Sequence, residues 1–298
     1  MQKHFPLLAI VCTPVFCLAQ SGNLSDWPNL MKKCDVKTAK PLCESYVNSK
    51  DIAQQAEAQK CLANVALCGN DLIQLEGDET GGGNIHGSFT PEAVDEALVH
   101  LNLGIQLAPQ DISIHEGRLH LLEVSGRYSE MVEALDDSCS IYKGKDAPDV
   151  WLAYSAELAD LRQYNVGLAF MKVLNVHYPN NPDILGNIGA FLSYLKRDDE
   201  AVPYLLKAVE MAPKDPINAW DLGREYDYTG QSALADKWYQ KGLALMTDPD
   251  QKKQSLCLYA QFIEKKLNDR SRACTMEQKD CPSDAQAACA PAAAPQAH

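Results

Sequence analysis

A helical pattern with a period of about 34 residues constrains the fold of this chain more than any other feature. One copy consists of Ala201, Leu205, Ala208 and Pro213, and Pro179 lies one period before that proline. An earlier copy of the same order consists of Ala97, Leu101, Gly104 and Pro109. Residues three and four apart line one helix face, and a proline ends a helix because it cannot continue the hydrogen-bond ladder. Since one unit cannot bury its own apolar face, the units must stack, and the sequence predicts an all-α fold.

The helices between these copies follow the same period. The stretch 220–226 contains a Leu-Gly-x-x-Tyr core, and Gly230 follows it at a turn. This order resembles the tetratricopeptide repeat, a family of helix–turn–helix units whose small residues let two helices approach closely. The resemblance covers about residues 91–270 and implies a right-handed α-solenoid of about five units with a concave groove. Two positions depart from the family pattern: the tryptophan lies one place late at Trp220, and Arg118 occupies a place that is ordinarily apolar.

Residues 1–19 have the composition of an export signal. Lys3 precedes an apolar run from Phe5 to Leu18, and Ala19 offers a small residue where a signal peptidase cleaves. The run is short for a membrane span, although an uncleaved anchor is the alternative. We expect a cleaved signal peptide over residues 1–19, export to the bacterial periplasm or the cell exterior, and no membrane-spanning segment in the mature chain.

Nine cysteines remain after that cleavage, which suits an oxidising compartment. Four lie in a helical segment over residues 20–90, where three pairings are open and the sequence does not choose among them. Cys61 and Cys68 are seven residues apart, about 10 Å along one helix, so they should not pair unless the helix ends between them. We expect a disulfide-stapled N-terminal cap, with Cys139 and Cys257 as packed core thiols. The disulfide candidates are Cys34, Cys43, Cys61, Cys68, Cys274, Cys281 and Cys289.

Two further stretches carry no repeat. The glycine-rich loop 77–87 lacks the lysine of a phosphate loop and the closing glutamate of a calcium loop, so we expect a flexible insertion. A weak metal site of Asp78, Glu79 and His86 remains open. Residues 271–298 contain cysteines and become rich in alanine and proline, which predicts a tail. The expected organisation is therefore a signal peptide, a cysteine-rich segment, a repeat array over 91–270 and this tail.

The sequence shows no pattern of catalytic residues. The mature chain has no CxxC, no HExxH helix and no GxSxG elbow. His115, Glu116 and His120 lie on one expected helix, but the two histidines face different directions and make a poor ligand set. A net charge of −13 disfavours binding to nucleic acid or to anionic lipid. We expect a protein that is not an enzyme and that has no cofactor and no metal.

The resemblance places the groove on the first helix of each unit. Tyr194, Tyr228 and Phe262 recur there, each one period after the last. Their rings would take apolar side chains of an extended peptide, while neighbouring polar residues hold its backbone or a carboxylate. The alternative is that these rings pack against the next unit. The candidate groove residues are Asn187, Tyr194, Trp220, Arg224, Tyr228 and Phe262.

These observations favour an exported scaffold that binds a protein or peptide in its groove. The acidic charge favours a basic or neutral partner. The family's clamp for carboxylate tails is disfavoured, because Ile217 and Asp221 stand where later basic residues are needed. Two alternatives remain: a cysteine-based redox or metal-handling factor docked on the repeats, and a structural spacer of the envelope.

Overall fold

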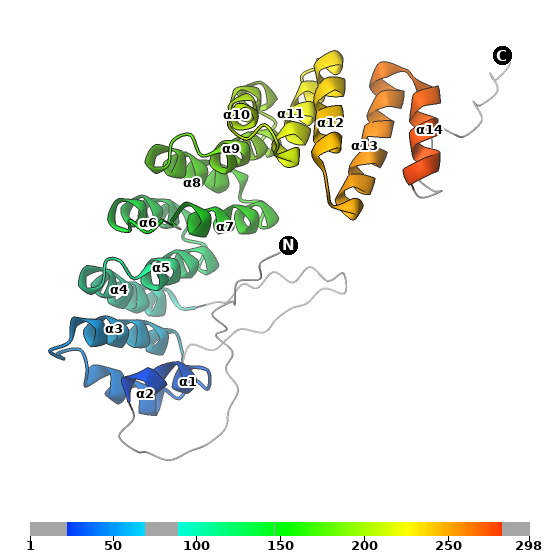
Figure 1. The fold of residues 1–298 in the computed structure, drawn as a ribbon. Helices are drawn as coiled ribbons and strands as arrows, with labels where there is room; N and C mark the ends of the chain where they lie inside the picture. The colour runs from blue at the N-terminus through cyan, green and yellow to red at the C-terminus, as the bar shows by residue number, and fades with distance from the viewer. Residues whose placement is uncertain (1–22, 69–88, 146, 282–298) are drawn as a thin grey trace. The chain divides into compact units, whose positions relative to one another are not determined.

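The computed structural model describes residues 23–68, 89–145 and 147–281, and within these ranges every regular element is a helix (Figure 1). The predicted all-α fold is confirmed for this part of the chain. The expected signal peptide, the loop 77–87 and Cys289 lie outside the described residues. Two compact units divide the chain, residues 1–147 and 148–298, and each is described by itself.

In the first unit, short helices precede longer ones that pack in sequence order. Its elements are η1 (Leu24–Asp26), α1 (Trp27–Met31), α2 (Val36–Glu44), α3 (Ile52–Leu67), α4 (Pro91–Leu107), α5 (Ile112–Val124) and α6 (Tyr128–Ile141). Helix α3 packs along α4, and α5 then packs on α4 and α6. The first unit therefore contains stacked helix pairs of the expected kind.

The second unit continues the same alternation of helices. Its elements are α7 (Ala147–Asp160), α8 (Tyr164–His177), α9 (Pro182–Tyr194), α10 (Asp198–Met211), α11 (Pro216–Tyr228), α12 (Ser232–Leu245), α13 (Pro249–Leu267) and α14 (Arg270–Asp280). Helix α14 packs against α13 and occupies the start of the stretch that the sequence assigned to a tail. No helix among the described residues is long and apolar enough to cross a membrane.

Local sequence signals fix where these helices begin and end. Asn181 and Asp215 cap α9 and α11, since each side chain accepts hydrogen bonds from two backbone N–H groups of the first turn, and a proline follows each cap. Pro179 and Pro213 lie just beyond the ends of α8 and α10. Because caps and prolines recur with the period of the repeat, consecutive copies have helices of matching length.

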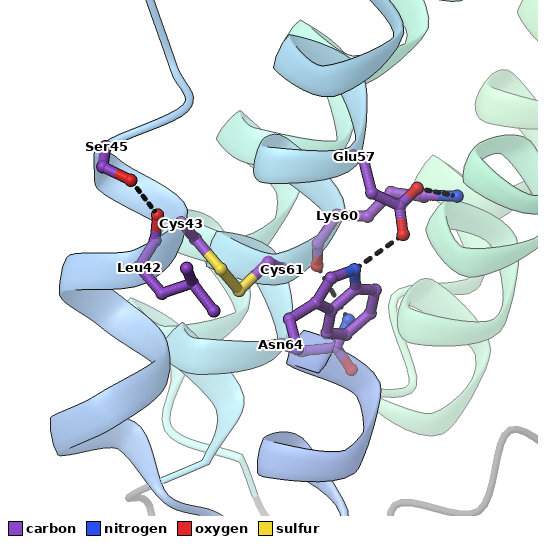
Figure 2. Close-up of a disulfide and its surroundings, with 8 residues drawn as sticks. Leu42, Cys43, Ser45, Glu57, Lys60, Cys61 and Asn64 are labelled. Atoms are coloured by element: carbon purple, nitrogen blue, oxygen red, sulfur yellow. Dashed lines mark hydrogen bonds and ion pairs between the residues drawn. A yellow bond between two sulfur atoms is a disulfide. The ribbon is translucent and has the colours of Figure 1, made fainter. Parts of the chain in front are cut away.

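Disulfides join the helices of the N-terminal segment. The structure pairs Cys43 of α2 with Cys61 of α3, as Figure 2 shows, and pairs Cys34 with Cys68. The Cα atoms of these pairs are 6.1 and 5.4 Å apart, and Cys61 and Cys68 do not pair with each other, as expected. The two linked loops are nested around a small apolar cluster that includes Trp27.

Polar contacts connect this segment to the repeats. The Trp27 indole donates to Glu57 over 2.6 Å. Figure 2 shows Glu57 beside Lys60, with which it forms an ion pair at 2.6 Å. Lys60 also reaches Asp111, the cap of α5, at 3.3 Å. The cysteine-rich segment is therefore packed onto the array, in keeping with the predicted stapled cap.

Near the C-terminus one cysteine prediction is wrong. Cys257 of α13 pairs with Cys281, the residue that ends α14, whereas the sequence placed it as a packed core thiol. Helix α14 brings Cys281 back to α13, which the absence of a repeat pattern after residue 270 did not indicate. Cys274 is also disulfide-bonded, and Cys139 is buried as expected.

Arg118, the departure from the family pattern, belongs to a buried polar cluster with His115. The guanidinium of Arg118 donates to the Ala134 carbonyl over 2.6 Å and to the Ser138 hydroxyl over 3.1 Å. His115 has no exposed surface, and its Nε2 lies 3.0 Å from the carbonyl oxygen of Pro109. These contacts satisfy most of the buried polar groups of the cluster, but Nε of Arg118 has no hydrogen-bond partner among the described residues.

This cluster makes the stability of the first unit depend on pH. Burial lowers the pKa of His115, and the nearby Arg118 lowers it further, although the Pro109 carbonyl opposes both. The unfolded chain therefore binds this proton at a higher pH than the folded chain. The stability contributed by neutral His115 is present above about pH 6.5 and is lost as the pH falls below that value.

We expect urea unfolding of His115→Gln to show a weaker loss of stability between about pH 7.5 and 5.5 than the wild type. An unchanged pH profile would contradict this assignment.

Candidate functional site

Two tyrosines of the predicted groove lie on the surface at the ends of α9 and α11. Tyr194 is 47% exposed and Tyr228 is 51% exposed. The Tyr194 ring stacks on that of Tyr164, with centroids 4.8 Å apart, and the Lys196 ammonium lies 5.3 Å from the centroid of the Tyr228 ring. Both rings are held by neighbours, yet each keeps about half of its surface open to a ligand.

Phe262 does not join this pair. It is only 5% exposed, and its ring lies against Tyr239 of α12, with centroids 5.1 Å apart, and against Tyr259. This burial contradicts the prediction that Phe262 lines a groove. The ring instead packs against side chains of α12 and α13. Trp220 is half-buried with its ring 4.6 Å from that of Tyr239, so it too packs toward α12.

A shift of one position explains the burial of Phe262. The caps Asn181 and Asp215 are one full repeat apart, whereas Asp248, the cap of α13, comes one position earlier than a further full repeat would place it. Phe262 therefore lies one position further along its helix than Tyr228 does along α11. One position rotates a helical side chain by about 100°, which turns it from the open face toward α12.

Arg224 interacts both with the two tyrosines and with carboxylates of the acidic part of the site. Its guanidinium forms an ion pair with Asp221 at 3.1 Å and approaches Glu225 at 3.5 Å. Burial lowers the pKa of Arg224, but the two carboxylates and the hydroxyls of Tyr228 and Tyr194 raise it more. Arg224, which we expected to hold the backbone or a carboxylate of a ligand, is thus already paired with carboxylates of its own helix.

Beside Arg224, α9 and α11 enclose a hollow of about 280 Å³. Asn187, the remaining predicted residue, lines it and donates from Nδ2 to the carbonyl of Asp183 over 2.8 Å. The residues around the hollow are Asp183, Gly186, Asn187, Ala190, Asp215, Ile217, Asn218 and Asp221. Of the predicted residues, Asn187 therefore lines the hollow and Arg224 pairs with Asp221 in its wall, whereas Trp220 and Phe262 pack toward α12.

The hollow is acidic, and its carboxylates affect one another. Burial and the neighbouring Asp215 and Asp149 raise the pKa of Asp183. Burial also raises the pKa of Asp221, against the opposing effect of Arg224. Sequence reasoning assigned no role to Asp183 or Asp215; the spacing of one full repeat between Asn187 and Asp221 was the signal that could have pointed here.

The other polar residues considered from sequence do not form a comparable site. His115 contacts Ser138 and Pro109, while His120 lies 3.5 Å from Glu123. In the described ranges no group of three or more histidine, cysteine, aspartate or glutamate side chains is arranged to hold a metal ion. Asp78, Glu79 and His86 lie outside those ranges.

Comparisons with known proteins identify the repeat. Residues 182–215, which span α9 and α10, match the family model of the tetratricopeptide repeat. No curated protein sequence matches the chain.

Several solved structures resemble the fold. The C-terminal part of a TPR repeat-containing protein from Cytophaga hutchinsonii is 12% identical, covers 90% of this chain and 100% of its own, and superposes with a TM-score of 0.53. MamA from Desulfovibrio magneticus RS-1, from residue 41 on, is 22% identical over 56% of this chain and 91% of its own, with a TM-score of 0.44. Residues 182–215 are therefore a tetratricopeptide repeat, and the described helices share the fold of a solved tetratricopeptide repeat structure.

Proposed function

We propose that this chain is an exported scaffold that binds an extended segment of a protein partner on the open faces of α9 and α11. Arrays of this repeat are protein–protein interaction scaffolds, and the finer assignment rests on one observation. Tyr194 and Tyr228 occupy the same place in consecutive repeats and are each about half exposed, at the C-terminal ends of the two helices that line an acidic hollow. Large aromatic side chains that stay accessible on a fixed helical frame are typical centres of binding energy.

The geometry of the two helices suits an extended ligand. Helix α9 touches α11, and the axes of helices in contact are at least about 8–10 Å apart, which is at least about three residues of extended chain. A peptide crossing α9 and α11 would contact both rings and leave one side chain over the hollow. The acidic surroundings favour a basic or neutral segment.

Export is supported by the apolar run from Phe5 to Leu18 and by the cysteine pairs. Cys43 and Cys61 have no exposed surface, so their link serves structure rather than exchange with other thiols. The proposed location is the bacterial periplasm or the cell exterior. The scaffold is proposed to act without a catalytic step, because its sequence carries no recognisable constellation of nucleophile and base.

A pair of alanine variants tests the binding face. We expect Tyr194→Ala/Tyr228→Ala to weaken the captured partner's affinity by at least about tenfold, because two anchors lose their rings. The measurement is affinity capture from an envelope extract with the mature protein, followed by titration of the partner retained. Circular dichroism checks that the variant keeps its helices.

Val176→Ala/Leu234→Ala is the matched control, since these side chains are 75% and 39% exposed but lie on α8 and α12. It should retain the partner at wild-type affinity. A partner held equally by the tyrosine variant would overturn the proposed face.

A further inference from the structure

We propose that the hollow between α9 and α11 binds a cationic side chain, the ammonium of a lysine or the guanidinium of an arginine, of the protein partner. This inference rests on the proposed function and names the chemistry of the residue recognised. The hollow would thus prefer a positively charged ligand group, whereas a clamp for carboxylate tails prefers a negatively charged one.

Carboxylates surround the hollow. Asp183, Asp215 and Asp221 all line it. Arg224 neutralises Asp221 at 3.1 Å, but among the described residues no lysine or arginine forms an ion pair with Asp183 or Asp215. Two carboxylates thus face the same space without a cation of this chain, and their mutual repulsion falls when a cation enters.

The side chain of Asn218 adds a polar group that is independent of these carboxylates. It is only 5% exposed, it lines the hollow, and within the described part of the chain its amide group forms no hydrogen bond. A Cβ added to Gly186 would lie only 2.2 Å from Oδ1 of Asn218. Residue 186 must therefore be a glycine for the Asn218 amide to occupy this place. Because this amide oxygen has no partner among the described residues, it is available to accept a hydrogen bond from a cation that enters the hollow.

The donors and acceptors match a cation. Nδ2 of Asn187 is used by the Asp183 carbonyl, which leaves its Oδ1 as an acceptor. Carboxylate and amide oxygens are acceptors, and lysine and arginine heads carry only donors. The volume, about 280 Å³, lies at the lower limit of pockets for whole small molecules and suits one inserted side chain. Tyr194 and Tyr228 would then contact the residues that flank it.

The test uses a defined probe with the full mature protein. The probe is a fluorescent nine-residue peptide of alternating alanine and lysine, acetylated and amidated so that its only cations are side chains. A second peptide replaces each lysine by norleucine. Binding is measured by fluorescence anisotropy at about 0.15 M salt, where exposed charges are well screened. We expect the lysine peptide to bind the wild type at least about tenfold more tightly than the norleucine peptide.

Asp183→Asn/Asp215→Asn removes the two unpaired charges and keeps an acceptor at the cap of α11. It should weaken binding of the lysine peptide by about tenfold. The matched control, Asp199→Asn/Glu210→Gln, removes the same charge from exposed positions on α10 and should change affinity less than about twofold. Asn187→Lys is a second variant that supplies a cation from the chain itself, and it should weaken the lysine peptide as well.

Several results would overturn the cation site. Equal loss in the α10 control would mean that the whole acidic surface attracts the probe. Equal binding of both peptides, lost in Tyr194→Ala/Tyr228→Ala, would leave the proposed binding face in place and remove the charge preference. Absence of binding by the lysine peptide up to about 1 mM would also refute it.

Discussion

Gly223→Ala is expected to destabilise the second unit by about 2 kcal/mol, although alanine is the better helix former. Gly223 lies on α11 where α12 crosses it, and an added Cβ would stand 2.9 Å from the backbone nitrogen of Tyr239. A backbone atom cannot rotate away, so the two helices must separate along their contact. The overpacking costs about 3 kcal/mol, and the gain in helix propensity returns about 1 kcal/mol.

Gly117→Ala on α5 is the matched control with the opposite sign. A Cβ there would meet its nearest neighbour, Cδ2 of Leu101, at 3.6 Å, which is an ordinary contact. This variant should gain about 0.5–1 kcal/mol from helix propensity alone. Urea unfolding followed by circular dichroism measures both changes. Stabilisation by both alanines would mean that the crossing of α11 and α12 is looser than described.

The same glycine shows why the fold could be predicted from sequence. Gly223 lies in the Leu-Gly-x-x-Tyr core of its unit, and its spacing to the proline of the preceding helix recurs along the chain. Each helix–turn–helix repeat contacts mainly the repeats next to it, so a local sequence pattern is enough to determine how the repeats stack. The pattern ends at α14, which packs on α13 without a repeat signature, and this is why the pairing of Cys257 with Cys281 was missed.

The candidate site could be predicted only in part, for a geometric reason. Tyr194 and Tyr228 share a position relative to their helix caps, so counting one full repeat from the first to the second placed both on the open face. Phe262 satisfies the same count but not the same distance from its cap, because α13 begins one position early in its repeat. The spacing between Tyr228 and Phe262 does not reveal that the Phe262 side chain is rotated about its helix. The distance of each residue from its own helix cap does reveal this rotation.

The acidic hollow required the stacked structure itself. Asp215 has an evident local role as the cap of α11, and Asp183 is an ordinary acidic residue in a first helical turn. Nothing in either signal indicates that α9 and α11 bring them to one space with a buried Asn218. Charge and burial between helices depend on how neighbouring units pack, and a linear pattern does not carry this information.

Cys43→Ala/Cys61→Ala is expected to cost the N-terminal segment about 3 kcal/mol, the largest loss among the stability changes considered. The link closes a loop with a sequence separation of 18 between α2 and α3, and both cysteines are fully buried. Without it the unfolded chain gains conformational freedom, while the short helices α1 and α2 have too small an apolar cluster to compensate. Hydrogen exchange of backbone amides in α2 and α3 measures the loss where it occurs.

The single variants decide whether the link or the packing of two sulfurs is responsible. Either substitution alone breaks the bond, so Cys43→Ala and Cys61→Ala should each lose nearly the full amount, and the double variant little more. If two separate packing losses were responsible, the single costs would be smaller and would add up. Additive costs would therefore reject the disulfide as the source of stability, and they would reopen a redox role for these cysteines.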